Sequence, residues 1–212
     1  MNATWIMDQT KLLTRSEIAA VLDDLKRKSK RATNTQMNLV IFRLATCCGL
    51  RASEITNLKM CHVRLSSQRP HIYLPKTFTK RSKARRVPLW WDSGTLTDIR
   101  DWKHLREQQG ASGDDLFAVS QGANFGKSLT RQKLYYRFKS ACRVLDKDQP
   151  GRTKLLTIHH GRHSFCSHAL AGGRSLAEVR DAAGHSNIST TSLYSHVAVD
   201  DGDVIGDIFN YQ

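Results

Sequence analysis

Residues 62–90 read HVRLSSQRPHIYLPKTFTKRSKARRVPLW, and their pattern differs from that of the rest of the chain. Three short runs within this stretch, 63–65, 71–74 and 86–89, are rich in β-formers and are bounded by turn-forming residues. The connection 76–85 is too long for a tight turn, and five of its ten residues are Lys or Arg. The sequence therefore predicts a small antiparallel β-sheet with a basic connection, which we call the basic hairpin (residues 76–85).

Helical patterns flank the predicted strands on both sides. Thr14-Arg-Ser-Glu17 has the form of a capping box, in which a hydroxyl and a carboxylate satisfy free amides at a helix start. We expect a polar, basic break over Lys26–Thr33 and then a second, apolar helix that ends near Gly49. The predicted fold class is mainly α with a small antiparallel β-sheet (α+β). Further helices are predicted at about 93–109, 130–145, 160–171, 175–183 and 189–196.

The chain of 212 residues is predicted to hold one compact domain. We expect a leader over residues 1–12, the domain over 13–198 and a C-terminal tail over 199–212. The tail carries an apolar strip that can dock on its own domain or on a neighbouring protomer, and we expect the second. The strip consists of Val204, Ile205, Ile208 and Phe209.

The charge balance is strongly basic. Lys and Arg number 33 against 19 Asp and Glu, which gives a net charge of +14 and a pI near 9.9. On a folded domain this excess points to a polyanionic partner, most simply nucleic acid. An ordinary solvated basic surface is the alternative, and the clustering of charge in the basic hairpin weakens it.

Two further features of the sequence bear on the cellular compartment. No apolar run approaches the length that spans a bilayer, and Met1–Lys11 lacks the layout of a signal peptide. The five cysteines are odd in number and fall mostly within apolar helical patterns. We therefore expect a cytoplasmic protein whose cysteines are buried free thiols.

Arg51 precedes a predicted short helix, Ala52–Leu58. A cation at a helix N-terminus is unfavourable alone, because the helix dipole is positive there. It becomes favourable when an anion binds between the guanidinium and the free amides, and a guanidinium can hold two phosphate oxygens at once. A surface arginine paired with Glu54 is an equally good interpretation of this segment, and we expect a structural role for Glu54.

Lys80 lies in the basic hairpin with Arg81, Lys83 and Arg85. A charged β-ribbon can enter a DNA groove and deliver one ammonium group to a leaving oxygen. The alternative is a solvated hairpin tip. The residues alone do not separate Lys80 from Lys83 as the proton donor.

His159 and Arg162 are three residues apart, so a helix places both on one face. An imidazole and a guanidinium together can bind one phosphate and stabilise its five-coordinate transition state. A zinc site built from the neighbouring histidines and Cys166 fits no standard tetrahedral spacing, so no metal is predicted. Core or helix-capping roles are expected for His160, His163 and His168.

Gly184-His185 and Tyr194 follow near the C-terminus. The glycine is a plausible helix stop, and the ring of His185 can then donate to a phosphate oxygen. Ser189 is a reasonable cap for the last helix. Tyr194 alone would be interpreted as a packing residue, and only its neighbours make it a candidate nucleophile.

The predicted helix 130–145 carries a basic face on an otherwise apolar background. Such a face suits contact with a DNA groove and its phosphates, and a solvated charged face is the alternative. The candidate DNA-binding residues on it are Arg131, Lys133, Arg137 and Lys139.

Taken together, four segments resemble the tyrosine recombinases, the phage integrase family. Gly49-Leu-Arg51-Ala-Ser-Glu54-Ile resembles the first arginine box, and Lys80 to Leu89 is similar to the β-hairpin lysine segment. His159-His-Gly-Arg162-His-Ser-Phe resembles the His-x-x-Arg box, and Ala183 to Val197 resembles the histidine and nucleophile box. The resemblance runs from about Leu13 to Val197, and the order and spacing of the boxes make it specific.

The resemblance implies the tyrosine recombinase catalytic-domain fold and a mechanism. Tyr194 would attack a DNA phosphodiester and leave a 3′-phosphotyrosine with a free 5′-hydroxyl. Lys80 would protonate the leaving oxygen, His159 would assist proton transfer at the tyrosine, and no cofactor or metal would be required. The partners would be double-stranded DNA and, on it, three further copies of a chain that is monomeric when free, at the nucleoid. The phosphate would be bound by Arg51, Arg162 and His185.

The chain departs from the family pattern at several points. Cys48, Gly161 and Ala183 stand where threonine, a large apolar residue and leucine are common, and we expect Gly161 to loosen its helix. A separate helical domain usually precedes the first arginine box, so we expect a catalytic domain alone, as in the short recombinases that invert fimbrial switches, or an excised fragment. The sequence leaves integration, excision and inversion open. A type IB topoisomerase and a non-catalytic DNA-binding relic are the alternatives.

Overall fold

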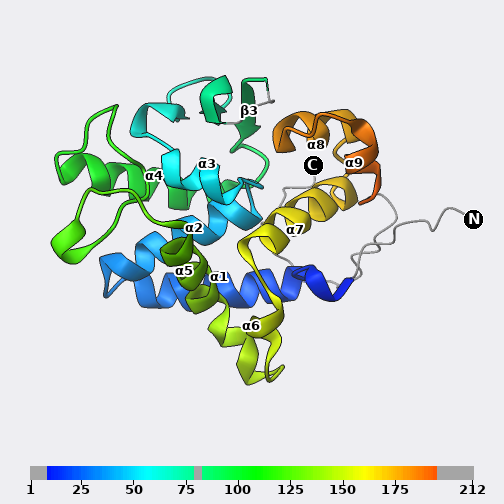
Figure 1. The fold of residues 1–212 in the computed structure, drawn as a ribbon, viewed down its shortest axis with the longest axis horizontal. Helices are drawn as coiled ribbons and strands as arrows, with labels where there is room; N and C mark the ends of the chain where they lie inside the picture. Colours follow the sequence, from blue (N-terminus) through cyan, green and yellow to red (C-terminus); the bar gives the residue numbers. More distant parts are fainter. Residues whose placement is uncertain (1–8, 79–82, 195–212) are drawn as a thin grey trace, which may run out of the picture.

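The computed structural model describes residues 9–78 and 83–194 (Figure 1). Lys80, Arg81, the tail 199–212 and most of the leader therefore lie outside the described residues. The described part is mainly helical, as predicted. Its main elements are α1 (Arg15–Ser29), α2 (Thr33–Thr46), α3 (Ala52–Asn57), β1 (Val63–Arg64), β2 (His71–Leu74), β3 (Arg85–Pro88), α4 (Ser93–Gln108), α5 (Arg131–Cys142), α6 (Arg152–Leu155), α7 (Ile158–Ala171), α8 (Leu176–Ala183) and α9 (Ile188–Ser192).

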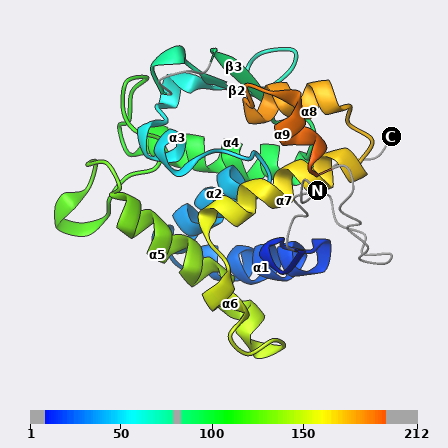
Figure 2. The ribbon, with the colours of Figure 1, turned by 45° about the vertical axis from the view of Figure 1, so that its right-hand side comes forward.

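The three strands form one antiparallel sheet in the order β1-β2-β3. Val63 pairs with Ile72 and Ile72 with Val87, and all three side chains are buried. The predicted sheet is confirmed, although the third strand begins one residue earlier than expected, at Arg85. The sheet lies near α8 and α9, and β3 contacts α8 (Figure 2). Strand pairing therefore brings the end of the basic hairpin to α8.

Helix α1 begins at the predicted capping box. Glu17 N–H donates to Thr14 Oγ1 at 3.1 Å, and Thr14 N–H donates to Glu17 Oε2 at 2.9 Å. The predicted break over Lys26–Thr33 is wrong in its first half, because α1 continues to Ser29. Basic side chains in the last turn of a helix are favoured by the helix dipole, and Asp24 also accepts a hydrogen bond from Lys28 at 2.5 Å.

Helix α2 forms the centre of the core. Nearly all of its side chains from Met37 to Thr46 are buried, and it contacts α1, α4, α5 and α7 (Figures 1 and 2). Its approach to α7 depends on Gly161, where a Cβ would lie 2.8 Å from Thr46 Oγ1 and 3.3 Å from a Cβ on Ala45. Helix α7 is continuous through Gly161, and this glycine allows close packing of α7 on α2.

The segment before α1 is tied to the second half of the chain. Arg152, at the start of α6, forms a buried ion pair with Glu17 and donates to the carbonyls of Thr10 and Leu12. His168 lies within the core and bonds to Leu13 O through Nε2, at 2.7 Å, which confirms its predicted core role. These contacts hold α1 against α6 and α7.

The five cysteines are unpaired, and all except Cys61 are buried. Among the helices that the structure describes, none is long and apolar enough to cross a membrane.

Candidate active site

Helix α8 ends at Ala183, and Gly184 follows in the left-handed conformation with φ of 68°, which confirms it as the helix stop. The last carbonyls of a helix have no partner inside the helix and form the negative end of its dipole. Three arginines from other elements donate to three successive carbonyls here, and we call them the arginine cluster (Arg51, Arg85 and Arg162). The contacts are Arg85 Nε to Ala182 O at 2.9 Å, Arg162 Nη2 to Ala183 O at 2.5 Å, and Arg51 Nη2 to Gly184 O at 3.1 Å.

Glu54 holds two members of the arginine cluster together. It is fully buried, and its two carboxylate oxygens accept from Arg85 Nη1 and Nη2, both at 2.7 Å. Glu54 also accepts from the backbone N–H of Arg51 at 2.7 Å and from its Nη1 at 3.0 Å. Burial alone would raise the pKa of Glu54, but the hydrogen bonds and charges of Arg85 and then Arg51 outweigh burial and lower it. The predicted structural role of Glu54 is confirmed.

Arg85 was predicted to bind DNA from the basic hairpin, and the structure gives it partners within the protein. Its side chain is buried, with 8% exposure, and its guanidinium is fully engaged by Glu54 and by Ala182 O. A buried cation is stable only with such partners. Arg85 therefore joins β3 to α3 and α8 through these contacts.

The arginine cluster carries more positive charge than Glu54 offsets, because this one carboxylate pairs with Arg51 and Arg85 while Arg162 bonds to backbone carbonyls. Arg162 is 3% exposed and also donates to Gly49 O at 2.6 Å. Burial, and next the charge of Arg51, lower the pKa of Arg162 to about 10, so it stays cationic at neutral pH. Arg51 remains partly exposed. This excess of positive charge favours an anion beside the two residues.

His185 lies directly after Gly184, on the segment that the arginine cluster holds. Its Nδ1 is 2.9 Å from Thr191 Oγ1, which orients the ring. Burial, and next the charges of Arg162 and Arg51, lower the pKa of His185 to about 3. The ring is therefore neutral at neutral pH and can present one N–H to a phosphate oxygen.

Tyr194 is buried, with 5% exposure, just beyond the end of α9. Its ring stacks on that of His185, with centroids 6.2 Å apart and an interplanar angle of 12°. Burial raises the pKa of the phenol, so it is protonated at neutral pH. The structure thus places Tyr194 and His185 near Arg162 and Arg51, four residues that the family resemblance assigns to one site. The expected Ser189 cap is wrong, because Asn187 caps α9 through its side-chain oxygen at 3.0 Å from Ser189 N.

The three histidines at the start of α7 have different surroundings. His160 accepts from Thr157 N–H at 3.1 Å, which confirms the predicted capping role. His159 is exposed, and partial desolvation followed by the charge of Arg162 lowers its pKa. His163, which was expected in the core or at a cap, is half-buried, and its Nδ1 lies 2.5 Å from Tyr194 Oη. The spacing of His163 from His159 was the available signal, since residues four apart share a helix face.

Comparison with known proteins agrees with this arrangement. Residues 11–200 match the model of the phage integrase family. The chain belongs to the phage integrase family. It is 30% identical over 163 residues to tyrosine recombinase XerD of Pseudomonas putida, covering 77% of this chain and 50% of that protein. It is 31% identical over 149 residues to tyrosine recombinase XerC of Escherichia coli O157:H7, covering 70% and 45%. The chain spans about half the length of the curated relatives it matches.

Solved structures confirm the predicted fold. The crystal structure of XerA recombinase aligns with a TM-score of 0.68 at 18% identity, over 93% of this chain and 61% of that one. The XerH site-specific recombinase, solved as a post-cleavage complex with its palindromic difH substrate, aligns with a TM-score of 0.68 at 24% identity, over 89% and 50%. The topoisomerase and relic alternatives are not favoured by these matches.

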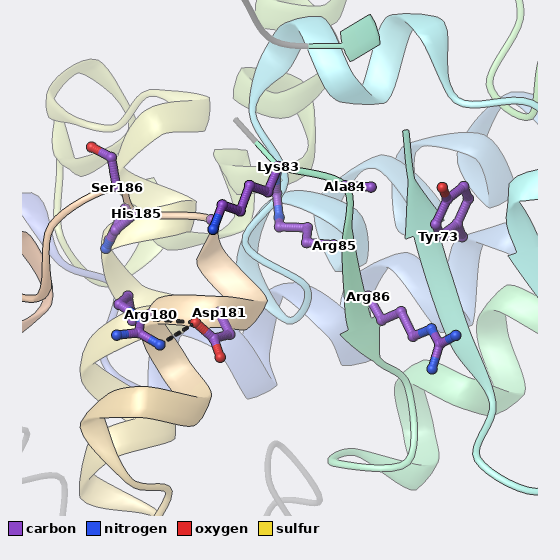
Figure 3. A pocket seen from close by; sticks show the side chains of 10 residues that line it. Tyr73, Lys83, Ala84, Arg85, Arg86, Arg180, Asp181, His185 and Ser186 are labelled. Carbon is purple, nitrogen blue, oxygen red and sulfur yellow. Dashed lines mark hydrogen bonds and ion pairs between the residues drawn. The ribbon is translucent and has the colours of Figure 1, made fainter. Parts of the chain in front are cut away.

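A cavity of about 910 Å³ opens beside His185 in this family member (Figure 3). It lies between β3 and α8, and Lys83 extends across it from the strand side. Arg180 lines the opposite side and pairs with Asp181 at 2.7 Å. Lys83 and Arg86 are exposed. A basic cavity next to the arginine cluster suits a phosphate backbone, whereas Lys80 and Arg81 lie outside the described residues.

The basic residues of α5 fall into two pairs. Arg131 and Lys133 are exposed in the first turn. Arg137 donates to Asn38 Oδ1 at 2.8 Å, and Lys139 donates to Lys154 O at 2.8 Å. Of the four predicted DNA-binding residues on α5, Arg131 and Lys133 are therefore the exposed pair, and Arg137 and Lys139 bond to other parts of the protein.

Proposed function

We propose that this chain cuts and rejoins DNA strands as a site-specific recombinase, through a 3′-phosphotyrosine intermediate. The observation that carries the proposal is the position of the Tyr194 ring against His185, on the segment to which Arg51 and Arg162 donate. A buried phenol beside a surplus of positive charge is suited to attack on a phosphodiester. The names of the relatives, tyrosine recombinases XerD and XerC, agree with it.

The proposed binding step places one phosphodiester beside Arg51, Arg162 and His185. Arg51 is partly exposed, and its guanidinium can grip two phosphate oxygens. Arg162 is held by two carbonyls and is preorganised, so little rearrangement is needed when negative charge develops on the phosphate. His185 adds an N–H donor from a neutral ring.

In the proposed chemical step, Tyr194 Oη attacks phosphorus and the bond to the 5′-oxygen breaks. The leaving oxygen takes a proton from a general acid, which we assign to Lys80. The phosphotyrosine bond conserves the energy of the broken bond, so a 5′-hydroxyl from another strand can reverse the attack without ATP. Whether the result is integration, excision or inversion depends on the DNA that supplies that hydroxyl.

The proposed partners are double-stranded DNA and further copies of this chain. Cleaving and exchanging four strands requires four nucleophiles, so we propose a homotetramer on DNA and a monomer when free. XerH and the Tn1549 transposon integrase, which share the fold, were solved with DNA. We place the working protein in the cytoplasm, at the nucleoid.

Covalent capture on DNA tests this function. Nicked duplexes made from genomic fragments are incubated with the protein, and adducts that survive denaturation are isolated and sequenced. We expect the wild-type chain to form an adduct on a 3′-phosphate and Tyr194→Phe to form none. Tyr73→Phe is the matched control, since its ring lines the cavity outside the proposed attacking position. An adduct that persists in Tyr194→Phe would contradict the assignment of the nucleophile.

A further inference from the structure

The hydroxyl of Tyr194 has one close histidine partner among the described contacts. His163 Nδ1 lies 2.5 Å from Tyr194 Oη, and the two rings are 5.6 Å apart at an angle of 36°. His163 lies on α7, which also carries Arg162, so the helix fixes the imidazole relative to the phosphate site. The hydrogen bond provides a direct path for the phenolic proton.

The protonation states of the pair define which group donates. Burial, and next the charges of His159, His160 and Arg162, lower the pKa of His163 to about 4. Burial raises the pKa of Tyr194. At neutral pH the imidazole is therefore neutral and the phenol carries its proton, so the phenol donates and Nδ1 accepts, with the ring hydrogen on Nε2. The phenol of Tyr194 is therefore placed as a proton donor, and the imidazole of His163 as the base that can accept its proton.

His159 lies differently. Its ring meets the ring of His163 edge-on, with centroids 4.4 Å apart, and its side chain is exposed. His159 is thus next to the base and near the solvent, a position from which it can influence His163 or contact DNA.

We propose that His163, and not His159, is the catalytic residue that accepts the proton of Tyr194. This assignment rests on the proposed function. As the bond from phosphorus to Tyr194 Oη forms and the bond to the 5′-oxygen breaks, the phenolic proton moves to His163 Nδ1. The general acid supplies the proton of the leaving 5′-hydroxyl. In the rejoining step the His163 imidazolium returns its proton to the phenolate as the tyrosine leaves.

DNA itself would activate this base. In the free protein His159, His160 and Arg162, all on the same helix as His163, disfavour a positive charge on its ring. A phosphodiester beside the arginine cluster brings a negative charge that opposes them. The imidazolium form is then less unfavourable, and His163 becomes a stronger base when substrate is bound.

The test measures the first-order rate of adduct formation with saturating nicked duplex in His163→Asn. An asparagine side chain can keep a hydrogen bond near the Nδ1 position but cannot take up a proton. We expect the rate to fall by roughly 10²–10⁴-fold, the usual contribution of a general base. DNA affinity and the unfolding midpoint are measured in parallel, and we expect both to stay close to wild type. A rate within about threefold of wild type would overturn the proposal.

Two substitutions of the reactants separate proton acceptance from other defects. Replacing Tyr194 with 3,5-difluorotyrosine makes the phenol more acidic. In the His163→Asn background, we expect this replacement to raise the rate of adduct formation by at least about tenfold. A 5′-bridging phosphorothiolate, whose leaving group needs no proton, should not restore it. Rescue by the phosphorothiolate, or none by difluorotyrosine, would overturn the assignment.

If His163→Asn folds poorly, His163→Ala with added imidazole tests the same step. We expect imidazole to restore adduct formation in a saturable manner, and an absence of restoration would count against the proposal. His159→Asn is the comparison variant throughout, and a fluorotyrosine rescue confined to His159→Asn would transfer the role to His159. Failure of the proposed function is distinguishable, because the wild-type chain would then form no adduct on any DNA.

Discussion

The arginine cluster and the first turn of α5 are both rich in cations, yet their surroundings are opposite. Arg85 and Arg162 are buried, share Glu54 or backbone carbonyls as partners, and lie beside a titratable phenol. Arg131 and Lys133 are exposed on a helix surface. The three arginines come from distant parts of the sequence, whereas Arg131 and Lys133 are two residues apart, so spacing in the sequence does not show which cations form a buried group. Burial and convergence make the distinction.

Removing the carboxylate inside the arginine cluster should have the largest effect. Glu54→Gln keeps the shape but leaves the buried guanidinium of Arg85 without a counter-charge, so we expect the free energy of unfolding to fall by about 3–5 kcal/mol. Glu107→Gln, at an exposed position on α4, is the matched control and should stay within about 0.5 kcal/mol. Denaturant unfolding followed by circular dichroism measures both. Equal losses of unfolding free energy in the two variants would contradict the expected difference between buried and exposed charge.

Acid should destabilise the site before it affects α5. The folded pKa values of His163 and His185, about 4 and about 3, lie below the ordinary value of 6.5. The unfolded chain therefore takes up protons that the folded chain refuses, and stability falls as pH drops from about 6.5 towards 4. The lowered pKa of Glu54 acts in the same direction at still lower pH. Thermal midpoints measured between pH 7 and pH 4.5 should decline, and His163→Asn should flatten the decline. A midpoint that rises in acid would contradict this account.

Changing α5 should have the smallest effect on stability and a distinct effect on binding. Arg131→Ala combined with Lys133→Ala should leave the free energy of unfolding within about 0.5 kcal/mol of wild type. If each side chain contacts one phosphate, the slope of log affinity against log salt should become shallower by about 2. Filter binding on a duplex at several salt concentrations measures the slope. An unchanged slope would mean that the exposed pair on α5 does not contact DNA.

Local patterns in the sequence were sufficient for most of the secondary structure. The Thr14 capping box and the alternation around Ile72 predict α1 and β2 because the deciding interactions lie within a few residues. The extension of α1 to Ser29 was also locally readable, since basic residues favour a helix C-terminus. The resemblance to the family boxes is sufficient to group Arg51, Arg162, His185 and Tyr194 in one site.

What the sequence did not predict depends on partners distant along the chain. In the sequence Arg85 resembles the other cations of the basic hairpin. Its structural role arises because the fold places Glu54 and Ala182 beside it. In the sequence His163 resembles a core histidine. Its contact with Tyr194 arises because the segment after α8 places the tyrosine hydroxyl beside His163 Nδ1. In both cases the residue type allows several roles, and only the tertiary contact selects one.

The contact between Arg85 and the end of α8 has a mechanical consequence. Arg85 lies five residues after Lys80, and Ala182 lies twelve residues before Tyr194. One guanidinium therefore connects the strand that leads to the proposed acid with the helix that leads to the proposed nucleophile. The position of that strand and the position of that helix are therefore set together by one side chain.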